Sequence, residues 1–163
     1  ADGTVTAANA SPINDGALAA FIANAAGVHR LGVDPLGRIV ASTTVGVEPH
    51  EFAVAPVPAI RALLARTALS ADDIALWEIN EAFAAVVLSC LHELPELDPE
   101  RVNVNGGAIA IGHPLGASAP RVIVDLCREL RRRGGGYGIA AACIGVGLGQ
   151  AVLVHVEAPA TKP

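Results

Sequence analysis

Three residue types that can exchange or donate protons lie among small residues in this sequence. His113 lies in the run NGGAIAIGHPLGAS, Cys143 precedes Gly145 in the run CIGVG, and Asn80 opens the run NEAF. Imidazole and thiol groups titrate near neutral pH, and an amide can donate a hydrogen bond to a developing negative charge. Glycine carries no Cβ, so a substrate could approach these side chains closely.

Each of these residues also has a purely structural interpretation. Asn80 can cap a helix, His113 can be a loop histidine with satisfied hydrogen bonds, and Cys143 can be a small buried hydrophobic residue. For any one of them alone, the structural interpretation is favoured. All three lie at boundaries between predicted elements, and their joint occurrence there favours a functional site.

The pattern of apolar and turn-forming residues predicts the elements that would position this site. β-branched runs bounded by Gly and Pro predict strands, and apolar repeats that follow Asn, Asp or Pro predict helices. The predicted helices cover 16–27, 58–69, 82–94 and 119–133, and the predicted strands cover 38–47, 74–79, 137–146 and 149–157. This order ends in a hairpin, and it predicts an α/β fold with a mixed β-sheet covered by helices.

Two predicted helical stretches, 16–27 and 82–90, are apolar nearly all round. A surface helix of an isolated domain carries a polar face. Because one sheet covers only one side of a helix, we expect the other side to pack on another domain or subunit. The alternative is that exposed alanines are simply tolerated, since alanine is weakly apolar.

Composition narrows the classes of function. The 163 residues fit one domain, and 11 Lys plus Arg against 16 Asp plus Glu give a formal net charge of −5. This balance argues against nucleic acid as a partner. The basic run RELRRR at 128–133 is interpreted as the solvated end of a helix. No apolar run reaches the ~18 residues of a membrane span, so we expect a soluble protein with no membrane partner.

The cysteines indicate a reducing compartment. Cys90, Cys127 and Cys143 include no C-x-x-C pair, so neither a disulfide framework nor a zinc site is predicted. We therefore expect a cytoplasmic protein without a bound metal. The chain has no methionine, even at position 1, so we expect other residues to precede it in the natural protein.

Five sequence words carry a resemblance to a known family: GTVTAANASPINDGA, PVPAIRALL, EINEAFA, VNVNGGAIAIGHPLGAS and CIGVG. Their order resembles the C-terminal half of the thiolases, the acyl-CoA C-acyltransferases, from Gly3 to about Val156. The resemblance implies that residues 1–163 form a thiolase C-terminal domain, half of the thiolase fold, with one helical layer packed on an N-terminal half. It also implies acyl transfer between coenzyme A thioesters, by Claisen condensation or by thiolysis of 3-ketoacyl-CoA.

The resemblance implies a role for each site residue. His113 matches the histidine that helps to deprotonate a nucleophilic cysteine and binds the thioester oxygen, and Asn80 matches the asparagine that holds a water in the same oxyanion hole. Cys143 matches the second cysteine, which removes or returns a proton at the substrate α-carbon. The N–H of Gly145 matches part of a second oxyanion hole, and Ser11 matches a contact to the pantetheine of coenzyme A. Coenzyme A thioesters are then substrates, with no permanently bound cofactor.

These roles explain the residue types. Condensing two thioesters requires an enolate, so hydrogen-bond donors must face the developing oxygen charge, and losing one such donor costs ~10²–10³ in rate. A thiol can act as the acid and base because its free pKa of ~8.5 can be lowered by neighbouring donors or positive charge.

The chain departs from the family pattern in one major respect. The family reaction also needs a cysteine that becomes acylated, which belongs to the N-terminal half. Cys90 and Cys127 lie within predicted helices and do not replace it. Further departures are Ala8 and Pro12, Ala119-Pro120, and Val146 and Leu148 in the segment after Cys143. Pro120 fits a first helical turn, whereas Val146 and Leu148 could narrow the pocket.

Three functional classes follow. The first is the catalytic half of a thiolase, whose N-terminal half forms a partner chain or domain. The second is an inactive module that binds coenzyme A, and the third is a module that completes a dimer. The presence of His113, Cys143, Asn80 and Gly145 together favours the first. An oligomer is expected, while acyl-chain preference and the choice between fatty-acid β-oxidation and biosynthesis stay open.

Overall fold

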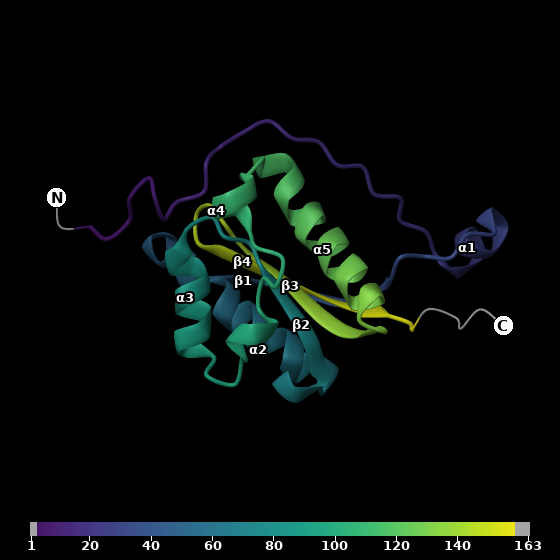
Figure 1. The fold of residues 1–163 in the computed structure, drawn as a ribbon. Coiled ribbons are helices and arrows are strands. Elements are labelled where there is room, and N and C mark those ends of the chain that lie inside the picture. Colours follow the sequence, from purple (N-terminus) through teal and green to yellow (C-terminus); the bar gives the residue numbers. More distant parts are fainter. Residues whose placement is uncertain (1–2, 159–163) are drawn as a thin grey trace.

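The computed structural model describes residues 3–158 and contains a mixed sheet of 4 strands (Figure 1). The strands are β1 (Arg38–Gly46), β2 (Ile74–Ile79), β3 (Gly136–Ile144) and β4 (Leu148–Val156). Their order across the sheet is β1-β4-β3-β2. β4 runs antiparallel to both of its neighbours, while β2 runs parallel to β3. The prediction of a mixed sheet is confirmed.

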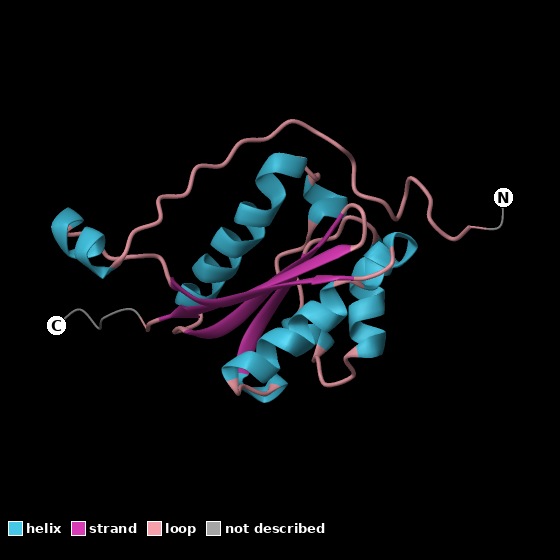
Figure 2. Ribbon diagram, turned by 180° about the vertical axis from the view of Figure 1, so that it is seen from behind, coloured by secondary structure: helices cyan, strands magenta, loops and turns pink. Residues whose placement is uncertain are grey.

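Helices cover both faces of the sheet (Figures 1 and 2). The helix α5 (Leu115–Arg132) lies on one face, while α2 (Pro56–Thr67) and α3 (Ala84–Glu93) lie on the other. The remaining helical segments are short: α1 (Ala25–Leu31), α4 (Ala108–Ile111), and three 3₁₀ turns, η1 (Pro49–Val54), η2 (Ala71–Asp73) and η3 (Pro99–Arg101). The result is a three-layer arrangement with a buried core on each side of the sheet.

The strand β2 contributes to both cores because successive side chains of a strand point to opposite faces. Trp77 and Ile79 pack with α2 and α3, where Ile60 and Leu63 are also fully buried. Leu76 instead packs under α5 in a second cluster. In a parallel strand covered on both faces, nearly every residue is apolar. The run IALWEI follows this rule except at Glu78.

Most helices and strands lie close to the residue ranges predicted from the sequence pattern. The strand predicted over 74–79 is β2, and the two closing strands form an antiparallel hairpin. The helix predicted over 58–69 begins slightly earlier, with proline in its first positions. Ser70 and Asp73 form a reciprocal capping box at the predicted turn before β2.

The helix predicted over 16–27 is wrong. Residues 11–24 form neither helix nor strand, and Figure 1 shows them as a long trace that arches past α5 to α1. A short helix is marginal in water unless it buries an apolar face. Here Phe21 is 83% exposed and Ile22 is 77% exposed, so within residues 3–158 no packing contact stabilises a helix at this place. The helix instead begins after Asn24, whose side chain accepts a hydrogen bond from the N–H of Gly27.

The placement of Pro120 in a first helical turn is also wrong. The helix α5 begins at Leu115, because the carbonyl of Pro114 already accepts the N–H groups of Ala117 and Ser118. Pro120 therefore lies inside the helix. It removes one backbone donor, and the carbonyl left without that donor belongs to Gly116, an exposed residue that water can reach.

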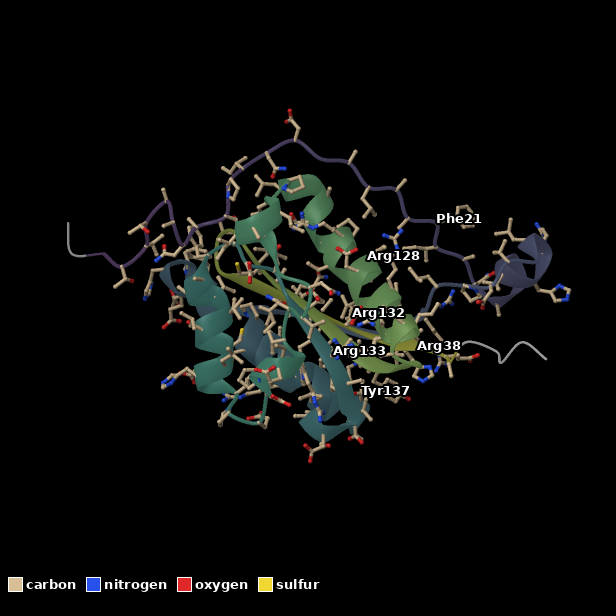
Figure 3. All side chains as sticks on the ribbon, in the orientation of Figure 1. Phe21, Arg38, Arg128, Arg132, Arg133 and Tyr137 are labelled. Carbon is tan, nitrogen blue, oxygen red and sulfur yellow. The ribbon has the colours of Figure 1, made fainter. Side chains whose placement is uncertain are left out.

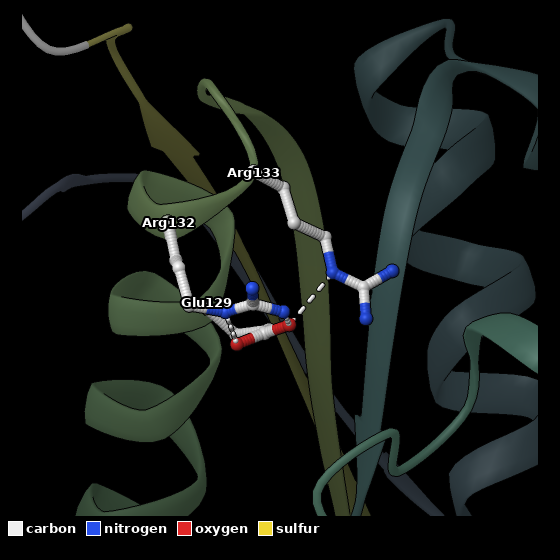
Figure 4. Close-up of polar contacts among 3 residues, drawn as sticks. All are labelled: Glu129, Arg132 and Arg133. Carbon is white, nitrogen blue, oxygen red and sulfur yellow. Dashed lines mark hydrogen bonds and ion pairs between the residues drawn. The ribbon is translucent and has the colours of Figure 1, made fainter.

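The basic run at the end of α5 is neutralised within the chain. Glu129 is 6% exposed and accepts hydrogen bonds from Arg132 and Arg133, which hold the pKa of its carboxyl well below the ordinary value (Figure 4). Arg131 pairs with Asp34. Figure 3 shows the exposed arginines on the last turns of this helix. These pairs support the interpretation of RELRRR as a solvated helix end.

The hairpin between β3 and β4 contains a strained residue. Val146 has a φ of 64° and is 81% exposed. β-branched residues are rare in this left-handed region. The turn is fixed by its next residue, Gly147, whose carbonyl accepts the N–H of Val47 and whose added Cβ would lie 2.3 Å from the carbonyl oxygen of Val47.

We predict that Val146→Gly stabilises the protein by about 0.5–1 kcal/mol, because glycine adopts a positive φ without strain. Urea unfolding would measure the change in the free energy of unfolding. Val146→Ala is the matched control, since it shortens the exposed side chain but keeps the Cβ that causes the strain. Equal effects of the two substitutions would contradict the explanation.

Candidate active site

Two of the predicted site residues leave the sheet at the same edge. Ile79 of β2 pairs with Ala141 of β3 in the parallel register, and the N–H of Asn80 donates to the carbonyl of Ala141 at 2.9 Å. Asn80 therefore follows β2 at the edge where β3 reaches Cys143. Ligand sites of α/β sheets commonly lie at the carboxyl ends of parallel strands.

The segment at Ser11 links this edge to His113. The N–H and hydroxyl of Ser11 both donate to the carbonyl of Ala82, at 3.1 and 2.9 Å. The carbonyl of the next residue, Pro12, accepts the N–H of His113 at 2.9 Å. Ser11, Asn80, His113 and Cys143 are thus all brought to one end of the sheet, and the hairpin that carries Gly145 follows directly.

The ring of His113 is held by a buried serine. Nδ1 of His113 lies 2.6 Å from the hydroxyl of Ser118, which donates its own proton to the carbonyl of Pro114 at 3.0 Å. The hydroxyl then accepts from an Nδ1–H group, which assigns the lone pair to Nε2. Burial, with a smaller contribution from the charge of Arg121, lowers the pKa of His113. At neutral pH the ring is therefore a neutral base with Nε2 free.

Asn80 has an unusual environment for an amide. The residue is 3% exposed, and its Oδ1 atom has no hydrogen-bond partner within the described chain. A buried polar atom without a partner costs ~1–3 kcal/mol, so such atoms are normally paired with protein or ordered water. The interpretation of Asn80 as only a helix cap is not supported, since α3 has no side-chain cap.

The pKa of Cys143 is raised in this chain. The thiol is half-buried, and burial raises its pKa above the ordinary value. Burial disfavours the charged thiolate more than nearby donors favour it. The resting group in this chain is a protonated thiol, beside the exposed Gly145 and the strained Val146.

Sequence reasoning missed the side chains that hold the loops of the site. Asn103 accepts the N–H of Ile79 at 2.7 Å and donates to its carbonyl at 2.9 Å, as a neighbouring strand would. Glu81 accepts the N–H of Ile109 at the start of α4. The signal for Asn103 was present, since asparagine tolerates the left-handed backbone that it adopts here, with a φ of 48°.

Two glycines allow these loops to approach closely. A Cβ on Gly107 would lie 2.3 Å from the carboxyl carbon of Glu81. A Cβ on Gly112, which has a φ of 91°, would lie 2.4 Å from the amide oxygen of Asn14. The glycine-rich run before His113 is therefore needed for the loop itself to pack.

A cavity of about 310 Å³ lies elsewhere, at the opposite end of the sheet. Arg38 at the start of β1, His155 at the end of β4 and Arg131 near the end of α5 line it. None of the predicted site residues contributes to its wall. Among residues 3–158, no group of three or more His, Cys, Asp or Glu side chains could hold a metal ion, and no helix is long and apolar enough to cross a membrane.

Comparison with known proteins identifies the family of the chain. A family model described as the thiolase C-terminal domain matches residues 33–156. The chain belongs to the thiolase family. Cytosolic acetyl-CoA acetyltransferase of Mus musculus is 51% identical over 153 residues, which are 94% of this chain and 38% of that protein. β-Ketoadipyl-CoA thiolase of Acinetobacter baylyi is 47% identical over 94% of this chain and 39% of its own length.

Solved thiolase structures share the fold. The crystal structure of human mitochondrial 3-ketoacyl-CoA thiolase in complex with CoA matches 96% of this chain and 40% of its own, with a TM-score of 0.86 and 43% identity. That of Acat5 thiolase from Ascaris suum in complex with coenzyme A has a TM-score of 0.85 and 43% identity, over 94% and 40% of the two chains. This thiolase chain therefore spans well under half the length of the relatives it matches.

One buried carboxyl of the thiolase domain has a strongly shifted pKa. Glu78 of β2 is 7% exposed, and burial, together with the negative charges of Asp125, Glu81 and Glu129, raises its pKa to about 8 despite the opposing charge of Arg121. Glu78 is therefore protonated at neutral pH. The folded chain keeps this proton between pH 5 and 8, whereas the unfolded chain releases it, so this group makes stability fall as the pH rises through that window.

We predict that Glu78→Gln flattens this fall and makes the protein ~1–3 kcal/mol more stable at pH 8, with little effect at pH 5. Glutamine keeps the shape of the protonated acid and cannot ionise. Urea unfolding at several pH values would measure the difference. Glu96→Gln, at an exposed site, is the control. A parallel pH dependence in Glu78→Gln and the unsubstituted protein would refute the assignment.

Proposed function

We propose that this chain is the C-terminal catalytic half of a thiolase, which transfers acyl groups between coenzyme A thioesters by Claisen condensation or thiolysis of 3-ketoacyl-CoA. One observation carries the proposal. The neutral ring of His113, fixed by Ser118, lies at the same sheet end as the thiol of Cys143 and the unpartnered Oδ1 of Asn80. Together these are a base, an acid and an acceptor that can hold a water for an oxyanion hole.

In this proposal His113 acts twice. Its free Nε2 takes the proton of the nucleophilic cysteine on the N-terminal half, and the ring then carries a proton at Nε2. That N–H donates to the thioester oxygen as negative charge develops on it. Asn80 supports the same oxygen through a bound water, which would also satisfy its buried amide. The fixed Nδ1 contact to Ser118 keeps the ring in one orientation during both steps.

Cys143 would move the proton at the substrate α-carbon. Its raised pKa suits the protonated thiol that returns a proton in thiolysis. In condensation the thiol must first lose its proton, and a bound substrate with an N-terminal half would have to supply the charge that makes this possible. The N–H of Gly145 would stabilise the acyl-enzyme oxygen, and Ser11 would contact pantetheine.

The partner in this proposal is an N-terminal thiolase half. The segment 12–24 presents Phe21 and Ile22 to solvent, and Figure 3 shows Phe21 away from the sheet. On α3, Leu88 is 63% exposed. Val87 of the same helix is half-buried and packs on the core. The exposed side chains of Phe21 and Ile22 are the apolar contact proposed for the N-terminal half.

One observation favours the alternative, an inactive module that binds coenzyme A or completes a dimer. Val146, one of the departures from the family pattern, holds a strained backbone at the proposed second oxyanion hole. A distorted hole would lower acylation and leave binding intact.

We also propose a cytoplasmic location, a homo-oligomer and a domain that spans residues 1–163. The relatives include enzymes named as cytosolic and as mitochondrial, so they do not separate these locations.

We predict that this chain gains thiolase activity when it is combined with a matching N-terminal half. Acetoacetyl-CoA cleavage by free coenzyme A would measure the turnover.

We predict further that Cys143→Ala in the combined enzyme removes carbon–carbon chemistry but allows acylation of the nucleophilic cysteine. Mass spectrometry would detect the trapped acyl-enzyme. Cys127→Ala is the control, since that thiol belongs to the buried face of α5 and not to the proposed site. Robust turnover by the isolated chain would overturn the division of roles between the halves.

We also predict that Phe21→Glu weakens association with the N-terminal half at least 10-fold, because a charge would enter an apolar contact. Titration of one half into the other would measure the Kd. Ala65→Glu, at an exposed position of α2 on the opposite face of the sheet from α5, adds negative charge away from the proposed contact and serves as the control. An unchanged Kd for Phe21→Glu would place the partner on another surface.

A further inference from the structure

Arg121 reaches back from α5 to the residue before His113. Its Nη1 donates to the carbonyl of Gly112 at 2.9 Å, and the side chain is part-buried there. The other bonds at this turn come from the backbone and from Ser118. The N–H of Gly112 donates to the carbonyl of Ala108, the first residue of α4, and the N–H of His113 donates to the carbonyl of Pro12. Arg121 thus closes the turn that links α4 to α5.

This turn depends on specific contacts rather than on regular structure. Gly112 has a φ of 91°, outside helix and strand geometry, and its neighbour Asn14 leaves no room for a Cβ. The peptide between Gly112 and His113 is fixed on one side by Pro12 and on the other by the guanidinium of Arg121. Without Arg121, the carbonyl of Gly112 would lose its side-chain donor.

Four acids lie near Arg121, and one of them, Asp125, forms an ion pair with Arg128 at 3.9 Å. The acids that face this region are Glu78 on β2, Glu81 after β2, and Asp125 and Glu129 on α5. Glu78 is protonated at neutral pH, Glu81 accepts the N–H of Ile109, and Glu129 is paired with Arg132 and Arg133. Arg121 is the cation whose charge acts on the His113 ring.

We propose that Arg121 is a positioning residue for the reaction, which holds the Gly112–His113 peptide so that the imidazole presents Nε2 to its proton donor. The proposal rests on the function proposed above. Arg121 acts through two routes, the hydrogen bond to Gly112 and the electrostatic cost that its charge places on an imidazolium ring. It does not itself contact the reacting atoms.

The test uses the whole enzyme that contains this domain, with Arg121→Gln, Arg121→Lys and the control Arg128→Gln on the exposed face of α5. We expect Arg121→Gln to lower kcat ~10–100-fold with a smaller change in KM. NMR titration of the His113 imidazole should show a higher midpoint, and the acid limb of the pH–rate profile should shift upward with it. Arg121→Lys keeps the charge, so it should lower kcat while the midpoint stays in place. Arg128→Gln should leave both unchanged.

These measurements separate the proposed thiolase function from the proposed role of Arg121. An unsubstituted enzyme without thiolase activity would refute the proposed function, and the imidazole titration would still test the role of Arg121. An unchanged His113 midpoint in folded Arg121→Gln would overturn the electrostatic route, and a normal kcat in Arg121→Lys would overturn the positioning route. If Arg121→Gln does not fold, Arg121→Lys decides the proposal by its rate, because a rate equal to that of the unsubstituted enzyme contradicts it.

Discussion

Ile79 pairs with Ala141 across the parallel junction of β2 and β3, and this register decides where the reactive side chains leave the sheet. A slip of one residue would exchange the faces of β2, so that Trp77 would meet α5 and Glu78 would enter the larger core. The burial of Trp77 and Ile79 in that core excludes the slip. Asn80 and Cys143 therefore share one edge because of packing that involves neither of them.

The connection between β2 and β3 carries the third reactive residue, His113. A parallel pair requires a long crossover, and here it runs through α3, α4 and α5 before β3 begins. The turn before α5 carries His113 back to the edge that β2 has just left. Backbone bonds to Pro12 and side-chain bonds from Ser118 and Arg121 fix it there. The long crossover that a parallel pair requires thus brings His113 to the same edge as Asn80 and Cys143.

Much of this arrangement could be predicted from the sequence, and the exceptions have physical reasons. The strand 74–79 and the helix α2 have local patterns that their packing reinforces. The stretch 16–27 is rich in helix-forming residues, but a short helix is stable only where its apolar face is buried, and nothing within residues 3–158 buries it. Asn80, His113 and Cys143 were visible as reactive types in small-residue surroundings. Ser118, Glu81 and Arg121 were not, because their roles arise from contacts that form only after folding.

The protonation states of His113 and Cys143 at this edge suit the first proposed proton transfer, to His113, but not a transfer to Cys143. His113 is held neutral and can accept a proton at once, whereas Cys143 keeps its proton because burial disfavours the thiolate. A proton taken by His113 would create a positive charge at the same end of the sheet. That charge favours a thiolate nearby for as long as His113 holds the proton. The two proposed proton transfers are therefore coupled by electrostatics, and transfer of the His113 proton to the departing coenzyme A thiolate would end that coupling.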